Sequence, residues 1–135
     1  MNNTLLKNER FEKTLKIENA VKYFQEKLAY EISAYELVKL LNEEYIQVID
    51  VRAREDYTEF HIQGALSIPV IDLKHNLARL SKDKINVVYC YDQNCRASSF
   101  AALILAENGY PVMELHGGFA AWNQKSFPID KCKSC

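Results

Sequence analysis

Residues that could do chemistry lie close together in the stretch YCYDQNCRAS, residues 89–98. Two cysteines, Cys90 and Cys95, and one arginine, Arg96, fall within seven residues of one another. A thiolate is both a nucleophile and a metal ligand, and a neighbouring guanidinium stabilises bound anions. Three interpretations are therefore open: a nucleophile in an anion-binding loop, half of a metal site, or two ordinary buried thiols.

The elements on either side of this stretch predict where it lies in a fold. INVVYC (85–90) has the continuous apolar character of a buried strand, and ASSFAALILAENG (97–109) predicts a helix that stops at Asn108 and Gly109. In α/β sheets, ligands bind at the carboxyl ends of the strands. Cys90 is thus expected at a strand end just before a helix N-terminus. There, unpaired N–H groups and the helix dipole should hold its pKa below the free-thiol value of about 8.5.

Alternating strands and helices are predicted along the rest of the chain. A capping box, Ser33 with Glu36 three residues later, opens a helix over 34–44. Apolar and turn patterns then predict strands at 45–51, 64–70 and 110–115, a short helix at 72–80, and a final helix over 119–124 after a turn at Gly117 and Gly118. This order predicts an α/β domain with a mainly parallel central sheet flanked by helices on both faces.

Composition limits the class of partner and the compartment. The 135 residues suffice for one domain, and a net charge of -1 without a basic cluster argues against nucleic acid as a partner. The polar N-terminus and the absence of a long apolar stretch predict no membrane partner and a cytoplasmic location. In that compartment the four cysteines are expected to be mostly reduced.

The first part of the chain, residues 1–32, is predicted to form a helical arm. Ile17, Val21, Phe24 and Leu28 follow one another at spacings of four, three and four, which places them on one face of a helix. We expect this apolar face to pack on the domain that follows.

Three motifs, in this order, resemble those of the rhodanese family. They are VIDVRAREDYTEFHIQGALSIP (48–69), VVYC (87–90) and ELHGGFAAW (114–122). The resemblance covers residues 33–128 and is strongest to bacterial single-domain members that carry a helical arm. It implies the rhodanese-like fold and a sulfurtransferase that needs no cofactor or metal. Cys90 would take sulfur from thiosulfate, polysulfide or a persulfide, hold it as a persulfide, and pass it to a thiol, a carrier protein or cyanide.

The resemblance also implies roles for the neighbouring residues. The backbone N–H groups of the loop would stabilise the anionic persulfide; this loop comprises Tyr91, Asp92, Gln93, Asn94, Cys95 and Arg96. Asp50 and Arg52 would form a buried ion pair behind the loop, because buried charges need partners. His61 would be a hydrogen-bonded framework histidine rather than a base, and Trp122 would belong to the core.

The loop departs from the usual rhodanese pattern in two ways. Five residues separate Cys90 from Arg96, as in the rhodanese-fold phosphatases and arsenate reductases, and none of them is glycine. We expect Asn94 to supply a left-handed conformation instead. Asp92 adds a negative charge that opposes a phosphate dianion. A Cys-dependent phosphatase or arsenate reductase and a non-catalytic sulfur carrier or binding module therefore stay open as alternatives.

The other cysteines have alternative interpretations. Cys95 either resolves the Cys90 persulfide as a disulfide or packs at the helix start; packing is favoured because a tight loop restricts disulfide geometry. Cys132 and Cys135 form a Cys-x-x-Cys pair in a predicted tail over 129–135. A zinc site there would need two more ligands and would block Cys90, so we predict no metal. A redox or sulfur-accepting tail and an idle, flexible chain end are the remaining interpretations, and the idle end is favoured.

Overall fold

The computed structural model describes residues 8–132 of the chain. The chain divides into two compact units, Met1–Tyr30 and Glu31–Cys135. No helix within the described range has both the length and the apolar character needed to cross a bilayer.

The N-terminal unit is helical. It contains α2 (Glu9–Thr14), which Asn8 caps by accepting a hydrogen bond from Arg10 N, and α3 (Ile17–Tyr30). The helix predicted from the apolar spacing is therefore present. Neither helix buries a residue, however. The packing of the apolar face of α3 on the second unit stays a prediction.

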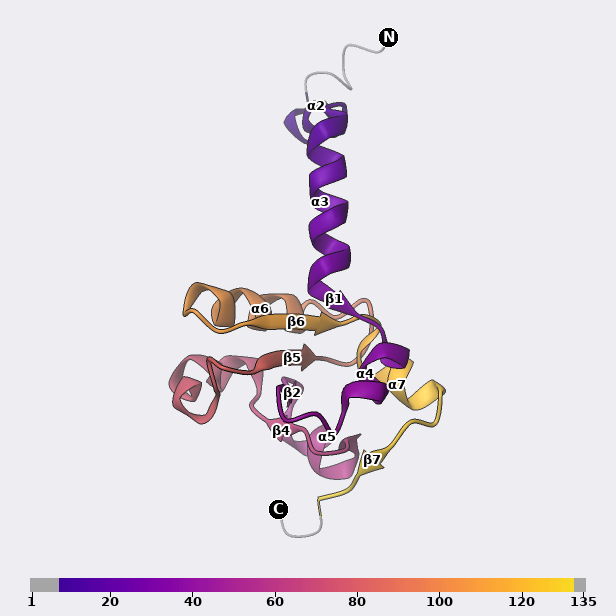
Figure 1. Cartoon of the computed structure of the whole chain (residues 1–135), viewed down its shortest axis with the longest axis vertical. Coiled ribbons are helices and arrows are strands. Elements are labelled where there is room, and N and C mark those ends of the chain that lie inside the picture. Colours follow the sequence, from indigo (N-terminus) through magenta and orange to yellow (C-terminus); the bar gives the residue numbers. More distant parts are fainter. Residues whose placement is uncertain (1–7, 133–135) are drawn as a thin grey trace. The chain divides into compact units, whose positions relative to one another are not determined.

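A five-stranded sheet forms the centre of the second unit. All its strand pairs are parallel, which confirms the predicted sheet. In spatial order the strands are β1 (Glu31–Ile32), β6 (Val112–Leu115), β5 (Ile85–Tyr89), β2 (Ile46–Asp50) and β4 (Leu66–Ser67) (Figure 1). A separate antiparallel pair joins β3 (His61–Ile62) to β7 (Ile129–Asp130). The sheet thus begins two residues before the boundary predicted at residue 33, because β1 pairs with β6 at its edge.

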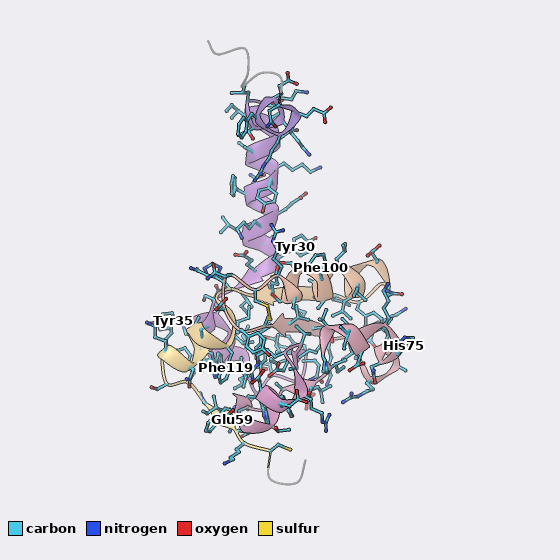
Figure 2. All side chains as sticks on the ribbon, turned by 180° about the vertical axis from the view of Figure 1, so that it is seen from behind. Tyr30, Tyr35, Glu59, His75, Phe100 and Phe119 are labelled. Carbon is cyan, nitrogen blue, oxygen red and sulfur yellow. A yellow bond between two sulfur atoms is a disulfide. The ribbon has the colours of Figure 1, made fainter. Side chains whose placement is uncertain are left out.

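Helices cover both faces of this sheet, as predicted. One apolar cluster joins Val87 and Tyr89 of β5 to α4 (Ala34–Leu40) and α7 (Gly118–Gln124), which lie next to each other in Figure 1. A second cluster joins Val88 and Cys90 to α6 (Ala97–Glu107) and the 3₁₀ helix η1 (Val70–His75). Successive side chains of a strand point to opposite faces, so Cys90 lies on the α6 side. Figure 2 shows side chains filling this unit, with Phe100 on the exposed side of α6.

Several elements differ from the sequence prediction. The capping box of Ser33 and Glu36 is present, but α4 ends at Leu40 rather than at residue 44. The helix expected over 72–80 is two 3₁₀ helices, η1 and η2 (Leu77–Arg79). The strand expected over 64–70 shrinks to β4, because a turn closes just before it with Ala65 N donating to Ile62 O. The short helix α5 (Arg54–Glu59) was not predicted.

Candidate active site

Cys90 lies immediately after β5, at the carboxyl end of a central strand, as its sequence position predicted. Its side chain belongs to the apolar cluster under α6, and the residue is only 1 % exposed. The start of α7 holds the backbone here: Phe119 N donates to Cys90 O at 2.9 Å, and Ala120 N donates to Tyr91 O at 2.8 Å. The position of the cysteine is therefore set by both β5 and α7.

Gly118 allows this close approach of α7. Its φ is +59°, and a Cβ atom there would lie 2.7 Å from Cys90 O and 3.0 Å from Asp92 N. No side chain fits at those distances without moving the loop. The sequence predicted only a turn at Gly117 and Gly118, although the glycine pair directly before a helix was a signal for such an approach.

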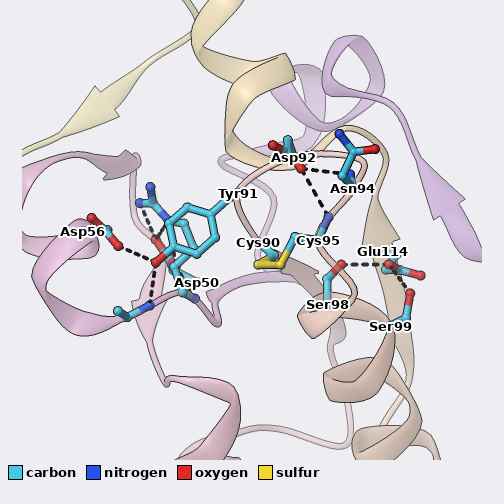
Figure 3. The surroundings of a disulfide bond; sticks show 12 residues. Asp50, Asp56, Cys90, Tyr91, Asp92, Asn94, Cys95, Ser98, Ser99 and Glu114 are labelled. Atoms are coloured by element: carbon cyan, nitrogen blue, oxygen red, sulfur yellow. Dashed lines mark hydrogen bonds and ion pairs between the residues drawn. A yellow bond between two sulfur atoms is a disulfide. The ribbon is translucent and has the colours of Figure 1, made fainter.

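Cys90 and Cys95 are joined by a disulfide across the loop (Figure 3). Their Cα atoms are 6.4 Å apart, and Cys95 is half-buried whereas Cys90 is buried. The favoured expectation, that Cys95 merely packs at the helix start, is therefore wrong. The loop is long enough to bring the two sulfur atoms together, because it turns back on itself at Asp92.

The carboxylate of Asp92 shapes this turn. Its Oδ1 accepts hydrogen bonds from Asn94 N at 2.8 Å and from Cys95 N at 3.2 Å, and its carbonyl oxygen also accepts from Cys95 N (Figure 3). Asn94 does not take the expected left-handed conformation, since Ser126 is the one non-glycine residue with positive φ within residues 8–132. The loop turns instead through the hydrogen bonds that the Asp92 side chain accepts from Asn94 N and Cys95 N.

The turn at Asp92 also reduces the number of loop N–H groups that are free to bind an anion, compared with the expectation from the sequence. Of the six loop N–H groups between Tyr91 and Arg96, those of Asn94 and Cys95 donate to Asp92 and are engaged within the loop. The other four find no hydrogen-bond acceptor among the residues that the structure describes.

Arg96 occupies the N-cap position of α6 and is exposed. Its guanidinium forms no ion pair with any residue in the described part of the chain. The first turn of α6 binds a carboxylate of β6 that the sequence did not indicate: Ser98 Oγ and Ser99 Oγ both donate to Glu114 Oε2, each at 2.8 Å (Figure 3). The charges near the start of α6 are thus mixed in sign.

A buried ion pair lies beside the end of β5. Asp50 is fully buried and Arg52 is 5 % exposed. The guanidinium of Arg52 contacts both carboxylate oxygens of Asp50, with Nη2 to Oδ2 at 2.8 Å, so the expected pair is present. Tyr89 Oη donates to Asp50 Oδ2 at 2.7 Å and accepts from Ile62 N at 3.1 Å. The pair therefore orients the residue that precedes Cys90.

The electrostatics of this cluster follow from burial. Burial raises the pKa of Tyr89 far above its usual value, and the charge and hydrogen bond of Asp50 raise it further. Burial opposes the charge on Arg52, but the hydrogen bonds and charge of Asp50 outweigh it and raise the pKa of Arg52. The arginine accordingly stays charged and the tyrosine neutral.

Tyr91 links the buried group of Asp50, Arg52 and Tyr89 to the surface. The contacts of its side chain were not predicted from the sequence. Its hydroxyl hydrogen-bonds to Asp56 Oδ2 and accepts from Ala53 N at 3.3 Å (Figure 3). The hydrogen bond to Asp56 raises the pKa of Tyr91, and partial burial adds to the effect. The guanidinium carbon of Arg52 lies 4.3 Å from the ring centre of Phe119 and 5.6 Å from that of Tyr91. Arg52 therefore connects the first residue of the loop to α7.

His61 and Trp122 occupy framework positions. His61 is 6 % exposed, its Nδ1 hydrogen-bonds to Tyr57 O at 2.8 Å, and its ring stacks on that of Tyr57 at 3.7 Å. Trp122 is fully buried and donates from Nε1 to Pro128 O at 2.8 Å. The expected place of Trp122 in the core is confirmed, and the framework role of His61 stays a prediction.

The residues of the tail take no observed part in this site. Cys132 N donates to Thr58 O at 3.1 Å, and Cys135 lies outside the described residues. Between residues 8 and 132, no group of three or more His, Cys, Asp or Glu side chains is placed to hold a metal ion.

The fold and the site together define a class: a parallel α/β domain with a cysteine at the carboxyl end of a central strand and a short loop that leads from it to a helix. The model of the Rhodanese-like domain matches residues 33–125 of the chain. The chain therefore belongs to the rhodanese-like domain family.

Known proteins similar to the chain agree with this assignment. The HTH-type transcriptional regulator Rv0324 of Mycobacterium tuberculosis is 32 % identical over 100 residues, which span 74 % of this chain but only 44 % of the regulator. Thiosulfate sulfurtransferase GlpE of Shewanella oneidensis is 32 % identical over 94 residues, 69 % of this chain and 91 % of GlpE. The crystal structure of the BH2092 protein from Bacillus halodurans superposes with a TM-score of 0.78 at 32 % identity, covering 87 % of this chain and 88 % of that one.

Proposed function

We propose that this chain is a sulfurtransferase that carries sulfane sulfur on Cys90. The observation that carries the proposal is the placement of Cys90, buried after β5 and followed within one short loop by the N-terminus of α6. A helix N-terminus and free N–H groups favour the thiolate form of cysteine. Membership of the rhodanese-like domain family and the similarity to a thiosulfate sulfurtransferase support the same reaction.

The reaction has two displacement steps. The thiolate of Cys90 attacks the outer sulfur of thiosulfate, the sulfur–sulfur bond breaks, and sulfite leaves with the bonding electrons. The outer sulfur stays on Cys90 as a persulfide anion. An acceptor thiolate, on a small molecule or a carrier protein, then attacks that outer sulfur and restores the Cys90 thiolate. The chemistry needs no cofactor, but the Cys90–Cys95 disulfide must be reduced first.

Backbone N–H groups stabilise the persulfide in this mechanism. The four loop N–H groups without a protein acceptor are the candidates, together with the first turn of α6. Asp50 and Arg52 act as positioning residues: Asp50 accepts the hydroxyl hydrogen bond of Tyr89, which precedes Cys90, and Arg52 packs on the ring of Phe119, whose N–H donates to Cys90 O. His61 supports the framework and takes no proton in this scheme.

The phosphatase or arsenate reductase alternative fits the site less well. A phosphate dianion needs several donors and a bidentate arginine. Asp92 occupies two of the loop N–H groups and adds a negative charge beside them. We therefore expect little or no hydrolysis of aryl phosphates by the native protein.

The test compares three samples of reduced protein: wild type, Cys90→Ser, and the control Cys132→Ser. We expect thiosulfate:cyanide transfer by the wild type and the control, and its loss in Cys90→Ser, because a serine hydroxyl does not form a persulfide. Full transfer by Cys90→Ser, or phosphate release from an aryl phosphate without any sulfur transfer, would overturn the proposal.

A further inference from the structure

The position of Cys95 is set by hydrogen bonds that do not depend on its sulfur. Cys95 N donates to both the carbonyl oxygen and Oδ1 of Asp92, each at 3.2 Å. Its Cα atom lies 6.4 Å from that of Cys90, within the usual range of about 4.4–6.8 Å for a disulfide. The backbone therefore holds Cys95 at bonding distance from Cys90 through contacts that involve neither sulfur atom.

The Cys90 end of the loop is held as firmly. Phe119 N and Ala120 N bind the carbonyl oxygens of Cys90 and Tyr91, and Gly118 packs directly against this backbone. Both ends of the loop thus have fixed contacts outside the disulfide. A thiol at Cys95 faces any group carried by Cys90 without a large movement of the chain.

We propose that Cys95 is a resolving cysteine that releases the sulfur bound to Cys90 as sulfide. The inference rests on the proposed function, since it requires a persulfide on Cys90. The Cys95 sulfur attacks the inner sulfur of the persulfide, which is Cys90 Sγ, and the bond from that atom to the outer sulfur breaks. The outer sulfur leaves with the electron pair and takes the proton of the Cys95 thiol, so hydrosulfide departs and a Cys90–Cys95 disulfide remains.

The disulfide in the structure is the same bond that this step forms. A further turnover requires a reductant, and the proposal assigns this role to a dithiol, which is oxidised to its own disulfide while both cysteines return to thiols. Cys95 is half-buried and Cys90 is 1 % exposed, so the incoming thiolate attacks Cys95 Sγ. Cys90 is then the leaving group, and the environment that favours its thiolate also speeds its departure.

The complete cycle is a reduction of sulfane sulfur. Thiosulfate and a dithiol give sulfite, sulfide and the oxidised dithiol, with two electrons passing from the dithiol to the transferred sulfur. The internal thiol competes with external acceptors for the persulfide, because a group held in place reacts at a high effective concentration. Sulfide release is therefore expected to be the faster outcome whenever Cys95 is reduced.

A single turnover without free reductant tests the proposal. The protein is reduced, freed of reductant without exposure to oxygen, and mixed with excess thiosulfate; sulfite and sulfide are then measured per chain. We expect wild-type protein to release both in equal amounts, close to one of each per chain. Non-reducing mass spectrometry should then find the Cys90–Cys95 disulfide and no added sulfur.

Two variants separate the resolving thiol from the other cysteines. Cys95→Ser should still release sulfite but almost no sulfide, and should keep one extra sulfur atom on Cys90. The control Cys132→Ser/Cys135→Ser removes the tail thiols and should behave like wild type. With a dithiol present, steady sulfide production by Cys95→Ser should fall by roughly tenfold or more, since only an external thiol can then attack.

The outcomes distinguish this inference from the function on which it rests. Sulfite release with a lasting persulfide in the wild type, or equal sulfide release by Cys95→Ser, would overturn the resolving role and leave the sulfurtransferase intact. No sulfite release by any sample would overturn both. The wild-type measurement decides the question even when Cys95→Ser fails to fold.

Discussion

Replacement of Gly118 by alanine tests whether the start of α7 holds the loop in place. Gly118 has φ +59°, where an L-residue costs roughly 1–2 kcal/mol relative to glycine. The new Cβ would lie 2.7 Å from Cys90 O, and overpacking against backbone typically costs about 1–3 kcal/mol more. We therefore expect Gly118→Ala to lower the free energy of unfolding by about 2–5 kcal/mol.

Gly64 offers a matched control for the cost of placing alanine at a positive φ without a steric clash. Its φ is +81°, but a Cβ atom there would have nothing within 4 Å. Gly64→Ala should thus cost only the roughly 1–2 kcal/mol of the left-handed conformation. The difference between the two variants, about 1–3 kcal/mol, isolates the contact between Gly118 and the loop. With an m-value of about 2 kcal/mol/M, the urea midpoints should differ by about 1 M.

The assay combines urea unfolding of both variants with sulfur transfer measured per folded molecule. Relief of the clash must move either α7 or the loop, and the hydrogen bond from Phe119 N to Cys90 O is then weakened. We expect lower transfer by Gly118→Ala and wild-type transfer by Gly64→Ala. Equal midpoints and equal activities for the two variants would refute the reasoning, since they would show that α7 does not hold the backbone of Cys90.

Two further predictions concern charge and proton binding around Cys90. Burial raises the pKa of Tyr89, so the folded protein keeps the hydroxyl proton that the unfolded chain loses above about pH 10. The free energy of unfolding should therefore fall above that pH, by up to about 1.4 kcal/mol per pH unit. Tyr89→Phe should lack this part of the slope in urea unfolding between about pH 8 and pH 11, and an unchanged slope would contradict it. Asp92→Asn keeps the acceptor oxygen of the turn but removes its charge, so thiosulfate affinity of the reduced protein should rise about fivefold, the equivalent of about 1 kcal/mol. Asp92→Ala, which also loses the turn, serves as the comparison, and equal affinities of wild type and Asp92→Asn would count against a charge effect.

Much of the fold follows from local patterns along the chain. Continuous apolar runs predicted β2 and β5, and the helical spacing and stop signals predicted α3 and α6. These elements are recognisable because their periodicity or burial repeats over many residues. Strands of two residues, such as β1 and β4, carry no such repeat and form only where a neighbouring strand offers backbone partners.

Part of the candidate site could also be predicted from local sequence. The order of strand, cysteine and helix is a local property, and it placed Cys90 correctly at the end of β5. The partnership of Asp50 with Arg52 was also predictable, since charges in a buried run need partners. The three motifs indicated the rhodanese family, and the match of the family model to residues 33–125 confirms it.

Only the tertiary structure decided how the loop is held. The contacts of Gly118 with Cys90, of Tyr91 with Asp56 and of Glu114 with Ser98 join residues that are far apart in the chain. No local pattern encodes such distances, which depend on how β5, α5, β6 and α7 pack. Cys95 shows the limit most clearly: its spacing from Cys90 allowed either packing or a disulfide, and the turn at Asp92 selects the disulfide by bringing the two sulfur atoms together.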